Sequence, residues 1–160
     1  MSESGLCSKE KPKLKGRVGR GGKEYHSIRF NTFTYNDFNV VHDLFYMKKT
    51  CNKGYIKVVP GYKILEAIIN PLALATWIMD DGSKENSGGM LLHTNSFSLR
   101  DVNRLQTLLK NKFKLDSSLR LKWNAERTVE YPLIYIRKKE MDKVRSLVKD
   151  HFSEDMLRKL

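Results

Sequence analysis

The sequence predicts an α+β protein with an antiparallel sheet, and two observations carry this prediction. From residue 71 onwards, hydrophobic periodicity predicts the order helix, strand, helix, strand, strand and helix. Such an order is typical of an antiparallel sheet with helices packed against it. The stretch before residue 71 has a similar order without an opening helix, which indicates a weak repeat of elements rather than of letters.

The charge balance points to a polyanionic partner. The chain has 160 residues, 40% of them hydrophobic, which suits one soluble domain or two small ones. It carries 30 Lys and Arg residues against 18 Asp and Glu residues, a formal net charge of +12. Because aromatic residues are interleaved with the basic ones, nucleic acid is the first candidate partner.

Several function classes are disfavoured by what the sequence lacks. Cys7 and Cys51 are far apart and neither belongs to a CxxC pair, which argues against a structural zinc site and a disulfide framework. The four histidines stand outside any HExxH motif. No signal-peptide region and no apolar run long enough to cross a bilayer is found. We therefore expect a soluble protein in a reducing compartment, with no membrane partner.

Residues 1–23 are rich in Lys, Gly and Ser and have little to bury, so we expect a basic N-terminal arm that is mobile or ordered only on a ligand. Its segment KLKGRVGRGGK fits a flexible RGG-type arm, a basic hairpin with a turn at Gly21-Gly22, or a phosphate-binding loop. The phosphate-binding loop fails because Lys23 is followed by Glu24 rather than Ser or Thr. The hairpin is favoured by the strand-forming residues that follow, Tyr25, Ile28, Phe30, Phe33 and Tyr35.

The next part of the chain predicts a helix, a strand and a short helix. Asn36 or Asp37 can cap the first helix, whose apolar positions follow a 3.6-residue period. These positions are Phe38, Val41, Leu44, Phe45 and Met47. After a polar break, a strand is expected at 55–60 and a short helix at 62–70.

Asn70-Pro71 predicts the start of a helix that runs to Asp81 and ends at Gly82, because proline is tolerated at the first helical position and glycine ends helices. This helix is apolar nearly all round, so we expect it to be buried on all sides. The remaining predictions are strands at 87–97, 117–124 and 131–138, amphipathic helices at 99–113 and 139–152, and a helical turn or two at 154–160.

The end of the 71–81 helix breaks a local rule. Asp80 and Asp81 stand at a helix C-terminus, where the helix dipole favours cations. Conflicts of this kind often mark functional sites. A divalent cation would resolve this one, since Mg²⁺ takes carboxylate and backbone carbonyl oxygens together. The structural alternative is a solvent-exposed Asp-Gly turn after a core helix.

The letters LATWIMDDG at 74–82 resemble the LAGLIDADG motif, in the LAxWxMDDG form found in intron-encoded endonucleases with two motifs. The resemblance covers roughly residues 24–160. Upstream, KVVP at 57–60 is similar to the lysine-containing segment that closes the family's first half. Downstream, the similar segments are TNSF at 94–97, NKF at 111–113, PLIYI at 132–136 and MLRKL at 156–160.

The resemblance implies the LAGLIDADG homing endonuclease-like fold, in which motif helices pack side by side and an antiparallel β-saddle lies in the major groove of DNA. It implies a site-specific endonuclease that hydrolyses phosphodiester bonds of double-stranded DNA with Mg²⁺ as cofactor. The acid before the motif glycine is implied to be a metal ligand and a catalytic residue, and here it is Asp81. Lys57 and Lys159 match basic residues near the phosphates and are further catalytic candidates.

The resemblance also implies base or phosphate contacts from both sheets. In the first sheet these residues are Arg17, Arg20, Lys23 and Arg29. In the second sheet they are Lys84, His93, Asn95, Arg120, Lys122 and Lys138. A shift of one residue in strand register would move each side chain to the other face.

Only the second motif is recognisable, which leaves the first motif helix and one active-site acid to come from elsewhere. A separate chain could supply them, or two copies could pair through residues 72–82 and bring two Asp81 side chains together. Alternatively, the chain is a degenerate product that binds DNA without cutting. The expected organisation is the arm at 1–23, an incomplete first half-domain at 24–70 and the second half-domain at 71–160.

A second function of the same fold stays open. LAGLIDADG proteins include maturases that help their host intron fold, and such a splicing factor would bind intron RNA through the same basic surface without carboxylate chemistry. The family resemblance implies a location in a mitochondrion or plastid, and otherwise in a phage or a bacterial cytoplasm.

Overall fold

The computed structural model describes residues 5–7, 12–29, 31–51 and 53–160. The chain divides into two compact units, Met1–His42 and Asp43–Leu160. We call them the N-terminal unit and the C-terminal unit. This boundary differs from those expected at 23/24 and 70/71, because strands pair across residue 23. The division into half-domains stays a prediction.

The N-terminal unit contains an antiparallel hairpin of β1 (Lys13–Val18) and β2 (Glu24–Arg29). A single 3-10 turn, η1 (Arg20–Gly22), joins the strands, so the hairpin with its Gly21-Gly22 turn is confirmed. Beyond β2, Thr32 bridges to Cys7, whereas Phe33 and Tyr35 lie outside any strand. Phe30 lies outside the described residues.

Four short elements follow: α1 (Phe38–Phe45), β3 (Tyr46–Lys48), β4 (Tyr55–Lys57) and α2 (Tyr62–Ile68). The strands β3 and β4 pair antiparallel, with Tyr46 opposite Lys57. Met47, expected in the helix, lies in β3 instead. The helix α2 ends two residues before the predicted end at Asn70.

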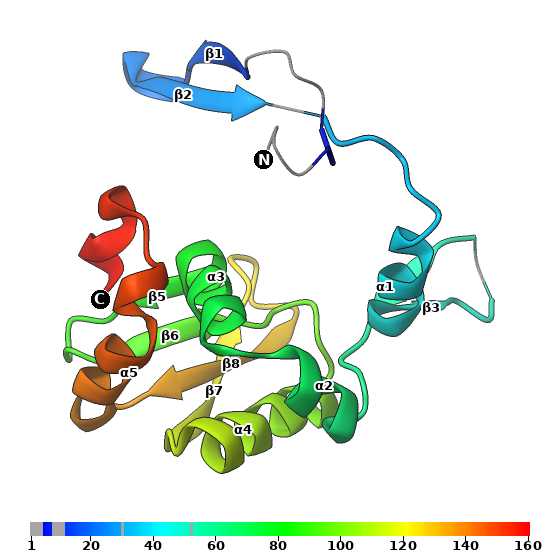
Figure 1. Ribbon diagram of the computed structural model, residues 1–160. Helices are drawn as coiled ribbons and strands as arrows, with labels where there is room; N and C mark the ends of the chain where they lie inside the picture. The colour runs from blue at the N-terminus through cyan, green and yellow to red at the C-terminus, as the bar shows by residue number, and fades with distance from the viewer. Residues whose placement is uncertain (1–4, 8–11, 30, 52) are drawn as a thin grey trace. The chain divides into compact units, whose positions relative to one another are not determined.

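The C-terminal unit is built on a four-stranded antiparallel sheet in the order β5-β6-β8-β7 (Figure 1). These strands are β5 (Gly82–Lys84), β6 (Met90–His93), β7 (Ser117–Trp123) and β8 (Glu130–Ile136). The helices that accompany them are α3 (Pro71–Asp81), α4 (Leu99–Phe113) and α5 (Met141–Val148). Short 3-10 turns complete the C-terminal part, η2 (Lys138–Glu140), η3 (Lys149–His151) and η4 (Glu154–Lys159).

One face of this sheet carries the hydrophobic core. Side chains alternate along a strand, so Met90 and Leu92 of β6 and Ile134 and Ile136 of β8 point to the same face and are fully buried. The helices cover this face with buried apolar residues, including Leu74, Ala75 and Ile78 of α3, Val102, Leu105, Leu108, Leu109 and Phe113 of α4, and Met141, Val144 and Val148 of α5. The opposite face of the sheet carries only a small apolar cluster of Leu91, Leu133, Tyr135 and the half-buried Tyr131. We call it the open face.

The predicted signals at both ends of α3 are present. The Asn70 side chain accepts a hydrogen bond from the Ala73 amide at 2.9 Å, and Pro71 is the first helical residue. Gly82 ends the helix with extended rather than left-handed dihedral angles (φ −81°, ψ 140°). A Cβ at Gly82 would lie 2.4 Å from the Ile78 carbonyl oxygen, so close approach of the backbone requires glycine there. The chain passes directly from α3 into β5.

Within the described residues, no helix is long and apolar enough to cross a membrane.

Candidate active site and nucleic-acid surface

The exposed C-terminal end of α3 carries Asp80 and Asp81. Successive residues of an α-helix are rotated by about 100°, so the two carboxylates point in different directions. Asp81 borders a pocket of about 180 Å³ with seven apolar residues, Phe45, Val59, Leu65, Ile69, Trp77, Phe97 and Leu105. Asp81 therefore lies where an apolar surface meets solvent.

Lys159 meets the same end of α3. Its Nζ donates hydrogen bonds to the carbonyl oxygens of Met79 at 2.5 Å and Asp80 at 3.4 Å. The C-terminal segment is held in place by Arg145, whose Nε and Nη2 donate to the Leu160 oxygen at 3.0 and 2.7 Å. A cation thus stands at the helix C-terminus, where the dipole favours one. Lys159 thus contacts the two residues that precede Asp81, and the catalytic roles of Lys159 and Asp81 stay predictions.

Lys57 is the third candidate catalytic residue, and the structure does not join it to the other two. It is the last residue of β4 and is exposed. Across the described part of the chain, no hydrogen bond or ion pair links Lys57 to Asp81 or Lys159. That Lys57 lies near a DNA phosphate stays a prediction.

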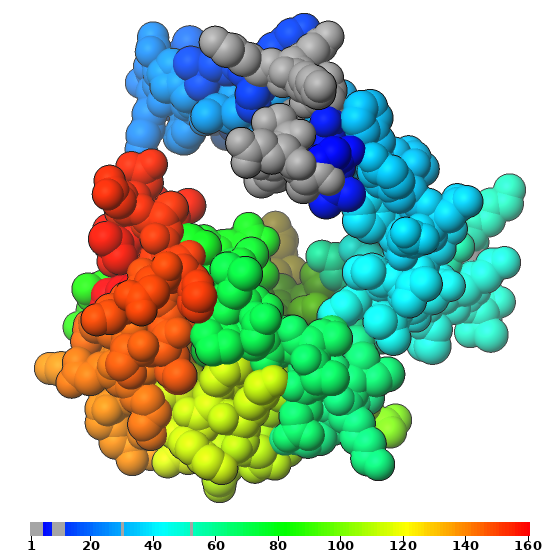
Figure 2. All heavy atoms as spheres, in the orientation of Figure 1, coloured from blue at the N-terminus to red at the C-terminus, as the bar shows by residue number. Residues whose placement is uncertain are grey.

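The expectation that α3 is buried on all sides is wrong. Only Leu74, Ala75 and Ile78 are fully buried, whereas Leu72 is 53% exposed. Thr76 and Asp80 are exposed as well, and with Leu72 they form an outward stripe at a four-residue spacing. Atoms of α3, green in Figure 2, are visible at the surface. The sequence is apolar nearly all round, but within the C-terminal unit the described residues cover only one side of the helix.

The described residues do not complete a metal site by themselves. They contain no group of three or more His, Cys, Asp or Glu side chains arranged to hold an ion. Asp81 and Asp80 supply two carboxylates that point in different directions from the same helix end. A complete site at Asp81 would need a further acid from another helix.

The open face of the sheet carries three of the predicted DNA-binding residues. The register places Arg120 opposite Leu133 and Lys122 opposite Tyr131, so both basic residues share the face of the Tyr135 cluster. His93 lies opposite Leu133 on the other side and shares this face. Its Nε2 is 2.9 Å from the Ser83 hydroxyl. These residues form one polar surface above an apolar floor.

The other predicted contacts of this unit lie elsewhere. Lys84 is opposite Met90, so the register directs it to the core side of the sheet, at the exposed edge strand β5. Asn95 is in the exposed turn after β6, and Lys138 lies in η2 beyond the end of β8. The structure does not place these three residues on the open face, and their DNA contacts stay predictions.

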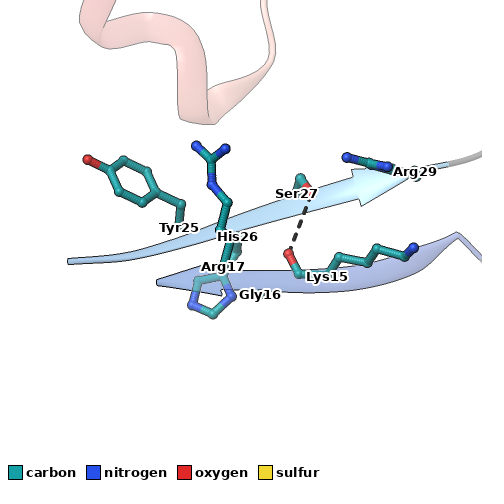
Figure 3. A pocket seen from close by; sticks show the side chains of 7 residues that line it. All are labelled: Lys15, Gly16, Arg17, Tyr25, His26, Ser27 and Arg29. Atoms are coloured by element: carbon teal, nitrogen blue, oxygen red, sulfur yellow. Dashed lines mark hydrogen bonds between the residues drawn. The ribbon is translucent and has the colours of Figure 1, made fainter. Parts of the chain in front are cut away.

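The β1–β2 hairpin of the N-terminal unit presents a second basic surface. Its register puts Arg17 opposite Tyr25 and Lys13 opposite Arg29, all on one face with Lys15. Figure 3 shows Tyr25, Arg17 and Arg29 on the same side of the strands and His26 on the other. Arg20 and Lys23 stand in and beside the turn. All four predicted contacts of this unit are exposed, and two of them, Arg17 and Arg29, share the basic face.

Comparison with known proteins decides which family combines these features. The family model described as "LAGLIDADG DNA endonuclease family" matches residues 1–144. The chain belongs to the LAGLIDADG DNA endonuclease family. The membership and the α+β fold expected from the motif are both confirmed. The endonucleases of this family use a divalent metal ion.

Two relatives of this LAGLIDADG chain are named for different functions, one as a maturase and the other as an endonuclease. The cytochrome b mRNA maturase bI2 of Saccharomyces cerevisiae is 39% identical over the whole chain, which spans 36% of that protein. The intron-encoded endonuclease ai4 of Dictyostelium discoideum is 30% identical, and the match covers all of this chain and 95% of that protein.

A solved structure shows the same LAGLIDADG fold. The homing endonuclease I-WcaI, bound to its DNA recognition sequence, matches with a TM-score of 0.73 at 27% identity. The match covers 94% of this chain and 64% of that one. The chain thus spans little more than a third of the yeast maturase and under two thirds of I-WcaI.

The structure adds functional candidates that the LAGLIDADG motif does not indicate. Trp77 lines the pocket beside Asp81, whereas the sequence predicts it only as part of a core helix. Glu85 and Tyr135 contact the Arg120 guanidinium. The turn that brings Glu85 there follows a three-residue strand without hydrophobic alternation, which left no periodic signal to detect.

Proposed function

We propose that this chain is a subunit of a site-specific endonuclease that hydrolyses phosphodiester bonds of double-stranded DNA with Mg²⁺. The observation that carries the proposal is the position of Asp81 at the exposed end of α3, where Lys159 donates hydrogen bonds to the carbonyl oxygens of Met79 and Asp80. A carboxylate that is exposed at the negative end of a helix dipole gains little for the fold and is available to a cation.

The donor set fits half of a magnesium site. Mg²⁺ is bound by a few carboxylates and keeps several waters, so one or two acids from each of two helices are enough. When bound, the metal activates the attacking water and stabilises the leaving oxygen. Asp81 would hold the ion. Lys159 fixes the carbonyl groups next to Asp81, and Lys57 is proposed to lie near a phosphate.

The second acid is proposed to come from another LAGLIDADG helix that packs on α3 through residues 72–82. The stripe of Leu72, Thr76 and Asp80 is exposed, and Ala73 next to it is small enough to permit close helix approach. The partner is either a second LAGLIDADG chain or a second copy of this one, which would bring two Asp81 side chains together.

Double-stranded DNA is the proposed substrate because each unit carries a basic face on an antiparallel ribbon. The major groove admits a two-stranded β-ribbon, and lysine and arginine side chains can reach its phosphates and base edges. The structural relative I-WcaI was solved bound to its DNA recognition sequence, which supports the same class of ligand here. By family resemblance, we propose a location in a mitochondrion or plastid.

A second candidate function is that of an intron RNA maturase. It is favoured by the 39% identity over the whole chain to a protein named as an mRNA maturase. The same basic faces would then bind structured RNA, and Asp81 would be a helix-end residue without a catalytic role.

A competition assay distinguishes the two candidates. The full chain is bound to a fluorescent duplex that carries the uninterrupted intron-insertion site, and unlabelled duplex or intron RNA is added as competitor. For the endonuclease, the duplex competes better and, with the partner helix supplied, is cut in Mg²⁺ but not in EDTA. Stronger competition by the RNA, together with an intact duplex, would overturn the endonuclease proposal in favour of the maturase.

A further inference from the structure

Arg120 extends from the edge strand β7 and is held by two contacts on the open face. Its guanidinium carbon lies 3.6 Å from the centroid of the Tyr135 ring. Its Nη1 donates a hydrogen bond to Glu85 Oε2 at 2.9 Å. By contrast, Arg17 and Lys23 lie 5.7 and 5.6 Å from the centroid of Tyr25. Close stacking and a charge-assisted hydrogen bond fix the Arg120 fork more tightly than either of these groups.

The turn between β5 and β6 positions Glu85 and Tyr135, the two residues that contact Arg120. Glu85 N bonds Gly89 O and Gly88 N bonds Glu85 O, both at 2.9 Å, which closes the turn. The Ser87 hydroxyl lies 2.9 Å from the Tyr135 hydroxyl. A Cβ at Gly89 would come within 2.6 Å of that hydroxyl oxygen, so the turn packs directly on the tyrosine. Glu85 and the ring are therefore placed relative to each other by the fold.

The contacts leave one edge of the guanidinium available. Within the described chain, Nη1 has the Glu85 partner, whereas Nε and Nη2 make no hydrogen bond. Arginine carries donors only, in a planar fork. Guanine is the base that presents two acceptors, O6 and N7, in the major groove, while every other base offers at least one mismatched group.

We infer that Arg120 is a specificity-determining residue that reads one guanine in the major groove, with Glu85 and Tyr135 as its positioning residues. The inference rests on the proposed function, because it requires duplex DNA on the open face. Glu85 is an acid on a surface that binds phosphates, so it weakens general affinity. Its contribution is to orient the arginine, which raises the preference for one base pair.

The test is a binding selection on a pool of randomised duplexes, carried out with the full chain and sequenced to give a preference at every position. The variants are Arg120→Ala, Arg120→Lys and Lys122→Ala. Lys122 is the matched control, because it lies two residues along on the same face and makes no ring or ion-pair contact within the described chain.

The wild type should enrich a G·C pair at one position by about 5-fold to 100-fold, the range expected for a bidentate contact. Arg120→Ala and Arg120→Lys should both lose the preference at that position and keep it elsewhere. Lysine retains the charge, so its failure to rescue identifies the fork. Lys122→Ala should lower binding to all sequences equally and reduce the salt slope by about 1.

Glu85→Gln gives a readout that a merely structural role would not move. It removes a negative charge from the binding face, so affinity for non-specific duplex should rise while the guanine preference falls. Equal loss at all positions in Arg120→Ala, or a retained guanine preference in Arg120→Lys, would overturn the inference alone. A wild-type selection without any preferred base pair would overturn the proposed function, and the inference with it.

Discussion

Asp81 and Lys159 carry opposite charges near the C-terminal end of α3. The helix dipole leaves partial negative charge there, which a carboxylate increases and an ammonium group offsets. Lys159 reaches the carbonyl oxygens of Met79 and Asp80, while Asp81 makes no hydrogen bond or ion pair within the described chain. The fold therefore gains from the lysine, and the exposed acid next to it stays available for the proposed role as a metal ligand.

Replacing Asp81 with Asn should not destabilise the protein. The free energy of unfolding should stay equal or rise by about 0.3–1 kcal/mol, because a like charge at the helix end is removed. Urea denaturation measures this, with Asp80→Asn as the control at the adjacent exposed position. A loss of about 1 kcal/mol or more in Asp81→Asn alone would assign the carboxylate a structural role.

Replacing Lys159 with Met should lower the free energy of unfolding by about 1 kcal/mol, because the C-terminal end of α3 loses a charged donor. Arg158→Met is the matched control, since Arg158 is exposed and makes no hydrogen bond or ion pair with the rest of the described chain. Equal effects of the two substitutions on urea denaturation would contradict a capping role for Lys159.

At the scale of elements, local signals predicted the helices best. The Asn70-Pro71 signal lies where α3 begins, and α4 has the predicted bounds 99–113. The predicted helix at 139–152 is instead the 3-10 turn η2, the helix α5 and the turn η3. Strand β5 was missed because three residues are too few to show alternation.

The sequence could predict only those candidate site residues that belong to a single local motif. Asp81 follows from the motif, which is local. Glu85 and Arg120 are separated by 35 residues, and Ser87 and Tyr135 by 48, so their contacts depend on register and on a turn that no local pattern specifies. The one-sided exposure of α3 was missed because its apolar letters do not reveal which side the rest of the fold covers.

The outward stripe of α3 should mediate association. Leu72→Glu should reduce self-association or binding of the partner helix in sedimentation experiments, because it replaces the apolar member of the stripe with a charge. It should leave the free energy of unfolding nearly unchanged, since Leu72 is 53% exposed. Leu99→Glu in α4 is the control, with 50% exposure at an unrelated surface. Equal sedimentation of both variants and the wild type would contradict a role of the stripe in association.

Substitutions on the core side of the same helix should lower the free energy of unfolding, unlike those on the outward stripe. Ile78 is fully buried, so Ile78→Ala should lower the free energy of unfolding by about 2–5 kcal/mol. Thr76→Ala, on the outward stripe, should change it by less than about 0.5 kcal/mol. Thermal unfolding of both variants measures the contrast. A comparable loss in Thr76→Ala would mean that the outward side of α3 is covered within the chain.

At the scale of the whole molecule, the net charge is +12, and basic residues gather on two surfaces. These surfaces are the hairpin of the N-terminal unit and the open face of the C-terminal unit. Binding to duplex DNA should fall steeply with salt, because neutralised phosphates release counterions. With about six phosphate contacts, the loss is about 10³-fold between about 50 and 200 mM salt. Fluorescence anisotropy checks this, and a flat salt dependence would contradict DNA binding through these faces.

The central claim is that Asp81 contributes one acid to a divalent-metal site that cuts duplex DNA. Its most direct measurement is cleavage of a duplex containing the intron-insertion site, in Mg²⁺, by wild type, Asp81→Asn and Asp80→Asn, each with the partner helix supplied. The account predicts that Asp81→Asn lowers cleavage by several orders of magnitude and leaves DNA affinity intact, whereas Asp80→Asn retains most of the activity. Equal cleavage by wild type and Asp81→Asn would contradict it.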